Sequence, residues 1–217
     1  MLRSGLVARN HPFTARYVRR LDLNSRLMNG SSVLVEVPQG HGLSLNGKFY
    51  PHCTSRDCTV MQAASDAAIH PSFVGPVMLV LRTFPIRVGN LMEIPPEGKS
   101  WDASMEWGKS GDCYPDQKEL TWDELGVEPE ITTVTKRVRR VFTFSQQQLI
   151  EAMSASRPTH IFLSHVDYLR DPTMYGWPFE RYIYKIKHTA QALHLPRPAI
   201  YWSDGPSTDD VHEWNWK

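Results

Sequence analysis

Residues 130–140, EITTVTKRVRR, hold three threonines and four cations within eleven positions. Their hydroxyl, ammonium and guanidinium groups form a dense row of hydrogen-bond donors. The segment is too short and too mixed to be a disordered basic tail, because such tails are longer blocks of like charge. It is either the solvated edge of a strand or a local binding site, and its surroundings must decide between the two.

Two further polar clusters follow apolar runs that are typical of buried strands. They are Ser164, His165 and Asp167 after IFL, and Ser203, Asp204, Gly205 and Pro206 after IYW. In a parallel sheet, ligands bind beyond the carboxyl ends of the strands. A carboxylate there can accept hydrogen bonds from N1 and N2 of guanine, a pair of donors that adenine does not offer. Asp167 is therefore a candidate base reader, and the alternative is a cap for the next turn.

Other catalytic motifs are missing. WGKSG at 107–111 resembles a phosphate loop, but that motif requires a glycine where Ala103 stands, and no strand precedes it. The histidines form no HxxxH or HExxH pattern, and Cys53 and Cys58 lack metal-ligand spacing, so no metal site is predicted. A Ser-His-Asp triad is set aside because the sequence has no GxSxG elbow.

The elements that must position these residues follow from hydrophobic patterning. Buried strands are predicted in 31–40, 76–89, 160–167 and 199–206, and helices in 58–70, 143–157 and 177–195. Ser145 and Gln148 have the spacing of a capping box, and Leu149, Ile150 and Met153 are expected to share one helix face. The last helix carries an apolar stripe made of Phe179, Tyr182, Ile183, Ile186, Ala190 and Leu193. Residues 90–130 are predicted to be one long irregular excursion. Alternating strands and helices indicate an α/β fold with a mainly parallel sheet covered on both faces.

The amino-acid composition limits the kinds of binding partner that the chain can have. Twenty-four Lys and Arg against twenty-three Asp and Glu give a net charge of +1, which disfavours nucleic acid and anionic membranes. Three cysteines without framework spacing suggest reduced thiols in a cytoplasmic protein. The apolar runs are too short to span a bilayer, so no membrane partner is expected. The first twenty residues are basic and form either a basic helix or a mitochondrial-type leader.

Six segments, in order, resemble the second half of adenylosuccinate synthetase. They are VLVEVPQG, YPHCTS, RTFPIRVG, EITTVTKRVRR, IFLSHVDYL and SDGP, within residues 31–210. The sequences PIRVG and TTVTKR most resemble those of a divergent branch of the family with phage-encoded members, some of which use deoxyguanylate. The resemblance implies an α/β fold related to P-loop NTPases. It also implies an unassigned segment at 1–30, a synthetase-like C-terminal portion at 31–217 and a missing N-terminal phosphate-loop segment.

The resemblance assigns three groups of binding residues. Gln39 and Thr54 would hold a purine monophosphate, with Val88 and Gly89 against its sugar. Thr135, Arg137 and Arg139 would receive L-aspartate, whose two carboxylates suit planar guanidinium groups. His165, Asp167, Ser203, Gly205 and Pro206 would hold the base of the nucleoside triphosphate.

The sequence departs from the family pattern at several of these places. His165 replaces the usual lysine near the triphosphate base, so the choice between guanine and adenine stays open. Lys136 replaces a usual glycine, Val37 and Pro38 replace small residues, and Arg56 and Asp57 replace small polar residues. The family's GDEGKGK-type loop, with its general-base Asp and supporting His, has no counterpart in these 217 residues.

The resemblance therefore predicts a ligase that joins L-aspartate to inosine monophosphate with GTP hydrolysis. Mg²⁺ is the implied cofactor, with ligands outside this chain, and a homodimer or a complementing N-terminal chain is the implied protein partner. One alternative is a phage-type 2-aminoadenylosuccinate synthetase that uses deoxyguanylate and ATP. Another is a truncated, non-catalytic protein that binds nucleotides or a subunit. A nucleic-acid binder that uses KRVRR is disfavoured by the net charge and would bind with strong salt dependence.

Overall fold

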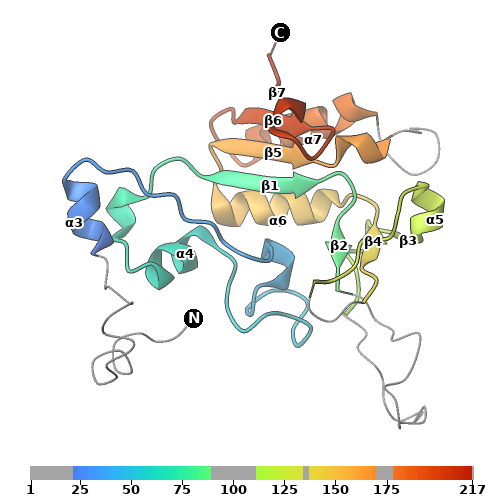
Figure 1. Cartoon of the computed structure of the whole chain (residues 1–217), viewed down its shortest axis with the longest axis horizontal. Helices are drawn as coiled ribbons and strands as arrows, with labels where there is room; N and C mark the ends of the chain where they lie inside the picture. Colours follow the sequence, from blue (N-terminus) through green and yellow to red (C-terminus); the bar gives the residue numbers. More distant parts are fainter. Residues whose placement is uncertain (1–21, 89–110, 134–136, 170–177, 217) are drawn as a thin grey trace.

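The structure, a computed structural model, describes residues 22–88, 111–133, 137–169 and 178–216 (Figure 1). Its centre is a four-stranded sheet in the order β1-β5-β6-β7. The strands are β1 (Met78–Arg82), β5 (His160–Ser164), β6 (Ala199–Ser203) and β7 (Val211–Glu213). The first three are parallel and β7 is antiparallel. The predicted α/β class with a mainly parallel sheet is confirmed.

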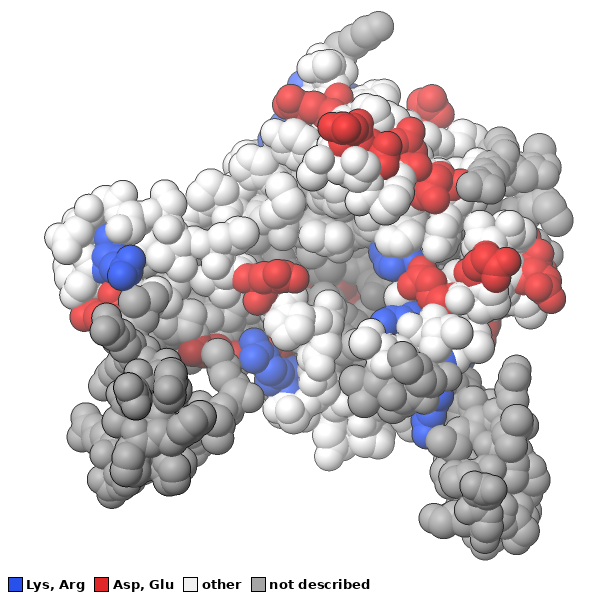
Figure 2. Space-filling model, viewed as in Figure 1, with Lys and Arg blue, Asp and Glu red and all other residues white. Residues whose placement is uncertain are grey.

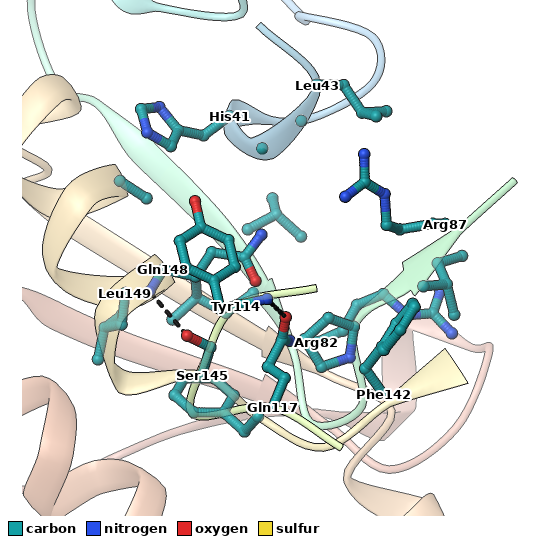
Figure 3. A pocket seen from close by; sticks show the side chains of 18 of the residues that line it. His41, Leu43, Arg82, Arg87, Tyr114, Gln117, Phe142, Ser145, Gln148 and Leu149 are labelled. Carbon is teal, nitrogen blue, oxygen red and sulfur yellow. Dashed lines mark hydrogen bonds between the residues drawn. The ribbon is translucent and has the colours of Figure 1, made fainter. Parts of the chain in front are cut away.

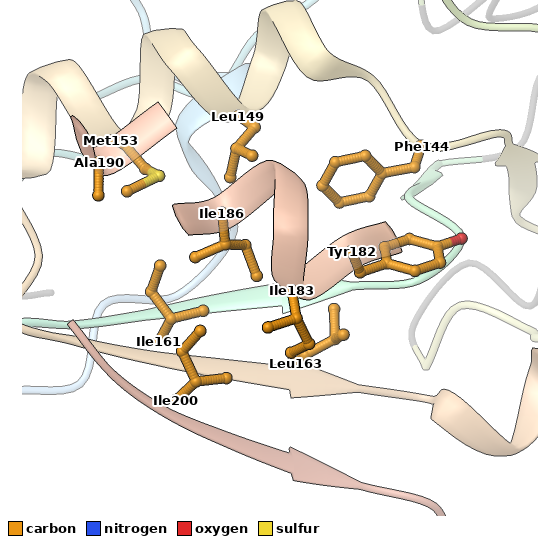
Figure 4. Close-up of a cluster of buried hydrophobic side chains, with 10 residues drawn as sticks. All are labelled: Phe144, Leu149, Met153, Ile161, Leu163, Tyr182, Ile183, Ile186, Ala190 and Ile200. Carbon is orange, nitrogen blue, oxygen red and sulfur yellow. The ribbon is translucent and has the colours of Figure 1, made fainter. Parts of the chain in front are cut away.

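One face of this sheet carries the core. Leu79, Ile161 and Ile200 lie side by side in register on it. The helices α6 (Gln146–Ser156) and α7 (Phe179–Ala192) contact each other and both pack on this face (Figure 4). The buried cluster consists of Phe144, Leu149, Met153, Ile161, Leu163, Tyr182, Ile183, Ile186, Ala190 and Ile200. The apolar stripe predicted for the last helix thus supplies four of its members.

Helix α6 begins as predicted, but its buried face is narrower. The Ser145 hydroxyl accepts a hydrogen bond from the backbone N–H of Gln148 at 2.9 Å. Leu149 and Met153 are buried, whereas Ile150 is 42% exposed. The prediction that Ile150 shares their face is wrong, because one residue further along a helix is a rotation of about 100°.

The other face of the sheet has no helix packed on it among the described residues. Val80, Phe162 and Tyr201 lie side by side in register there. Met78 and Val80 are 53% and 62% exposed, and Phe162 and Tyr201 are partly exposed. The expected coverage of both faces is therefore not found in the part of the chain that the structure describes.

Residues 31–40 also differ from the prediction. They follow α3 (Leu23–Met28) and lead to the short helix η1 (His41–Leu43) without forming a strand. Leu34 is 96% exposed and Val35 is 39% exposed, so the predicted buried strand is wrong. A strand requires a hydrogen-bonded neighbour, and no described segment pairs with this one. The helix predicted in 58–70 is confirmed as α4 (Val60–Asp66).

A second, antiparallel sheet has the order β2-β4-β3. It consists of β2 (Ile86–Arg87), β4 (Arg140–Phe142) and β3 (Glu119–Leu120). The helix α5 (Trp122–Leu125) follows β3, with a capping box between Thr121 and Glu124. In the described part of the predicted irregular excursion, residues 111–130, β3 and α5 are the regular elements and the rest is irregular, whereas residues 90–110 lie outside the described residues. No described helix has the length and apolar character to cross a membrane.

Candidate functional site

A cavity of about 320 Å³ lies between β1, the loop 39–43, the second sheet and α6 (Figure 3). Leu43, Phe142 and Leu149 give it apolar walls from three different elements. Its polar lining includes His41, Arg82, Arg87, Gln117 and Gln148. Apolar walls with a few convergent polar groups are the usual features of a small-molecule site.

The loop 39–43 is shaped by two unusual backbone positions. Gln39 adopts a positive φ of 70°, and a Cβ at Gly42 would lie 2.9 Å from Nε2 of Gln148. Glycine at 42 therefore lets the loop approach α6 closely. Gln39 lines the cavity, and the backbone N–H of Thr54 donates to the Leu43 carbonyl at 2.8 Å. Thr54 adjoins the loop, although it is not among the lining residues.

Arg87 is fixed at the cavity by backbone carbonyls. Its guanidinium donates to the carbonyl oxygens of Asp112 at 2.7 Å and His52 at 3.1 Å. Burial, followed by the nearby charge of Arg140, lowers the pKa of Arg87. Val88 follows it and is 49% exposed, outside the cavity lining, and Gly89 lies outside the described residues.

Burial also shifts the pKa values of His41 and Tyr114, two further titratable groups of the cavity wall. Burial lowers the pKa of His41, against the carboxylates of Glu151 and Asp57, so its imidazole is neutral at pH 7. Burial also raises the pKa of Tyr114, whose hydroxyl donates to Glu151 at 2.7 Å. The wall therefore offers neutral polar groups, and the cationic groups come from the arginines.

The segment that opened the sequence analysis is a β-hairpin. The N–H of Arg139 donates to the Glu130 carbonyl at 2.8 Å, and the N–H of Thr132 donates to the Arg137 carbonyl at 2.8 Å. The N–H of Arg137 also donates to the Thr132 hydroxyl at 2.9 Å. Thr135 belongs to the connection between the two arms and lies outside the described residues.

Successive side chains of a strand point to opposite faces, so the arginines of this hairpin arm lie on two different sides. Arg140 forms a bidentate ion pair with Glu119, with both N–O distances at 2.6 Å, and its side chain is only 8% exposed. Arg139 lines the cavity. The Nε of Arg137 is buried, and no described residue accepts its hydrogen. Arg140 thus holds the second sheet, whereas strand alternation places Arg137 and Arg139 on the other side of the arm, and only Arg139 of these two lines the cavity.

Glu130 connects the hairpin to the end of the main sheet. Its carboxylate accepts hydrogen bonds from Arg82 at the carboxyl end of β1 and from the Tyr168 hydroxyl, the latter at 3.3 Å. Nε2 of His165 lies 3.9 Å from the same carboxylate. Glu130, Arg82 and Tyr168 were not predicted, because their contacts join positions separated by 38 and 48 residues.

His165 and Asp167 lie where β5 ends. His165 has a positive φ of 62°, and its Nδ1 lies 2.9 Å from the Ser164 hydroxyl. Burial, followed by the charge of Arg82, lowers the pKa of His165, while Glu130 and Asp167 oppose the shift. Asp167 is in the first turn of η3 (Val166–Leu169), and no described residue donates a hydrogen bond to its carboxylate.

The second polar cluster lies beside the first. β5 and β6 are neighbours, and η3 contacts β6. Ser203 is buried at the end of β6, and a Cβ at Gly205 would clash with the Asp210 carboxylate, which caps η4 (Thr208–Asp210). Pro206 belongs to the same tight turn. The structure therefore brings both predicted base-binding clusters to one edge of the sheet.

Charge is distributed unevenly around this edge. In the view of Figure 2, Lys and Arg side chains flank the hollow beside the second sheet, whereas acidic side chains gather over α5 and β7. The described residues contain no group of three or more His, Cys, Asp or Glu suited to a metal ion.

Residues 11–174 match the family model of adenylosuccinate synthetase. The chain belongs to this family. An N6-succino-2-amino-2'-deoxyadenylate synthase of Vibrio phage phiVC8 is 40% identical over 185 residues, which cover 85% of this chain and 47% of the relative. An adenylosuccinate synthetase of Archaeoglobus fulgidus is 31% identical over 156 residues, which cover 72% of this chain and 40% of the relative.

A solved structure of the family is also similar. It is the cyanophage S-2L succinoaminodeoxyadenylate synthetase bound to dGMP and to dATP as an energy donor, with 32% identity and a TM-score of 0.74. The match covers 96% of this chain and 54% of that synthetase. The chain thus spans about half the length of the adenylosuccinate synthetase relatives that it matches. The division at residue 30 and the ligand roles of the individual residues stay predictions.

Proposed function

We propose that this chain supplies the aspartate- and nucleotide-binding part of a ligase that joins L-aspartate to dGMP, with an adenine nucleoside triphosphate as energy donor. The observation that carries the proposal is the 40% identity, over 85% of the chain, to a phage N6-succino-2-amino-2'-deoxyadenylate synthase. The dGMP and dATP bound to the S-2L synthetase support the same pair of nucleotides.

In this proposal the cavity holds the purine monophosphate. Gln39, in the loop 39–43, contacts the base. Thr54 holds that loop through the hydrogen bond from its backbone N–H to the Leu43 carbonyl. Val88 and Gly89 contact the sugar, next to the fixed guanidinium of Arg87. The apolar walls suit the faces of a purine ring, and the polar groups suit its edge and its phosphate.

The hairpin receives aspartate. Arg137 and Arg139 bind its two carboxylates through charge-assisted hydrogen bonds, and Thr135 adds a hydroxyl. The support for this role is that Arg140 is already paired with Glu119, whereas the buried Nε of Arg137 has no acceptor among the described residues. The aspartate amine would then face the purine held in the cavity.

The cluster at the ends of β5 and β6 holds the donor base, through His165, Asp167, Ser203, Gly205 and Pro206. A neutral imidazole at 165 lacks the cationic donor that a lysine would offer to O6 of guanine. The Asp167 carboxylate can accept a hydrogen bond from the exocyclic amine of adenine. The neutral imidazole favours an adenine donor over GTP, whereas the Asp167 carboxylate can accept a hydrogen bond from either base.

The reaction balances as two transfers. The γ-phosphoryl group moves to O6 of the purine as N1 loses its proton, and the aspartate nitrogen then attacks C6, so that O6 departs as inorganic phosphate and the amine loses a proton. Mg²⁺, when bound, would neutralise phosphate charge, with ligands outside the described residues. The phosphate-loop part of the family would come from polypeptide outside these 217 residues, in the same chain or in another.

The second candidate is the reaction of inosine monophosphate with GTP. The similarity to the Archaeoglobus fulgidus adenylosuccinate synthetase keeps it in consideration. The two candidates share the aspartate hairpin and differ in both nucleotides.

A substrate comparison separates them. We define the S-2L complement as the part of the cyanophage S-2L synthetase that lies outside its match to this chain. With the 217 residues joined to this complement, we expect turnover of dGMP with ATP or dATP and aspartate, and a much lower kcat/KM for inosine monophosphate with GTP. A preference for inosine monophosphate and GTP would select the second candidate.

A further inference from the structure

The sheet face opposite α6 and α7 is apolar and exposed. Val80, Phe162 and Tyr201 form a strip across three strands, with Met78 and His160 in register beside it, and Val80 is 62% exposed. Parallel sheets are almost always buried on both faces, because their crossover connections place helices there. Contiguous exposed apolar surface on such a sheet marks an interaction site.

The neighbouring edge of the sheet is also open. β1 has a hydrogen-bonded neighbour on one side only, β5, among the described strands. Residues 33–37, Val-Leu-Val-Glu-Val, have the composition of a strand but pair with nothing that the structure describes, and Leu34 is 96% exposed. The open edge and the unpaired segment are two independent signs that polypeptide is required here.

We propose that the face formed by Met78, Val80, Phe162 and Tyr201, together with residues 33–37, is the docking surface for the remaining half of the synthetase fold. The chain matches only 54% of the S-2L synthetase, so about half of a related fold is available to cover this face. The inference rests on family membership and on the exposed strip, and it does not depend on the proposed substrates.

Residue-specific thiol labelling tests this surface without an activity assay. Val80→Cys places a thiol at the centre of the strip, and Ile150→Cys places one on the outer side of α6, where the native residue is 42% exposed. The modified sites are resolved from the native cysteines by mass spectrometry. In the 217-residue chain alone, both thiols should react readily.

After the chain is joined to the S-2L complement, we expect the labelling rate at Val80→Cys to fall at least about tenfold, as for a site that reacts only through local opening. Labelling at Ile150→Cys should not change. Hydrogen exchange at residues 33–37 and 78–82 should slow in the same joined protein. Turnover is measured in the joined protein with native Val80, because Val80 also lines the cavity. If Val80→Cys is protected in the joined protein but the protein with native Val80 does not turn over, the docking surface stands and the proposed function fails.

Three results would overturn the inference. The first is a joined protein in which Val80→Cys reacts as fast as in the lone chain. The second is protection in the lone chain that increases with its concentration, which would make a second copy the occupant. The third is protection in the lone chain at every concentration, which would mean that its own residues cover the strip.

Discussion

Arg137 offers the sharpest test of the hairpin as the aspartate site. Its buried Nε has no acceptor among the described residues, so Arg137→Leu breaks no hydrogen bond of that atom within the described fold. A charge-assisted hydrogen bond to a substrate carboxylate contributes about 2 to 3 kcal/mol, or roughly 30- to 150-fold in affinity. We therefore expect the KM for aspartate to rise by roughly that factor in the joined enzyme, with the KM of the purine little changed.

Arg140→Leu is the matched control on the same hairpin arm. It breaks the bidentate pair with Glu119 and the hydrogen bond to the Gly111 carbonyl. Because Glu119 is 44% exposed, we expect a loss of only about 1 to 2 kcal/mol in the free energy of unfolding. The KM for aspartate should change little. The assignment is refuted if Arg137→Leu leaves that KM unchanged, or if Arg140→Leu raises it equally.

Other consequences can be measured separately. Asp167→Leu should raise the KM of the triphosphate about tenfold or more, and an unchanged value in steady-state kinetics would remove the base-reading role. Glu130→Gln should lower the pKa of His165 further, because Glu130 opposes the shift caused by burial, and an NMR titration that shows no change would contradict this. Because folding lowers the pKa values of His41 and His165, these two side chains take up protons at a higher pH in the unfolded state than in the folded state. Stability should therefore fall as the pH drops below about 6.5, with a shallower fall in the His41→Asn/His165→Asn variant in urea unfolding. The 217-residue chain alone should give no turnover, and steady turnover free of host enzyme would contradict the need for a phosphate-loop part.

The main sheet was predictable because its strands and helices carry their own patterns. Apolar runs predicted β1, β5 and β6. Ser145 marked the start of α6, and the apolar stripe of residues 179–193 predicted α7. The single strand predicted over 76–89 is wrong, because the structure divides it into β1 and β2, which belong to different sheets. The other strands of the second sheet, β3 and β4, were missed because two or three residues are too short to show a period. Residues 31–40 were predicted as a buried strand from their apolar run, but burial and pairing depend on neighbours that no local pattern contains.

The site was predictable only in part. The resemblance assigned Arg137 and Arg139 to the aspartate site. Strand alternation explains why Arg140 points to the other side of the arm, where it pairs with Glu119. Glu130 was not predicted, because its role comes from Arg82 and Tyr168, which approach it only in the folded chain. The adjacency of the clusters at His165 and Ser203 followed from the carboxyl ends of neighbouring parallel strands.

Binding of dGMP to the purified 217-residue chain, followed by NMR chemical shifts, tests the central claim most directly. The claim is that the cavity between the loop 39–43 and the hairpin is the purine monophosphate site. It predicts weak, saturable binding, with shifted amides in residues 39–43, 52–54, 86–88 and 137–139 and in the cavity-lining parts of β1 and α6, and with Arg87→Leu abolishing the shifts. Absence of binding at millimolar dGMP, or shifts that map to the outer side of α7, would contradict it.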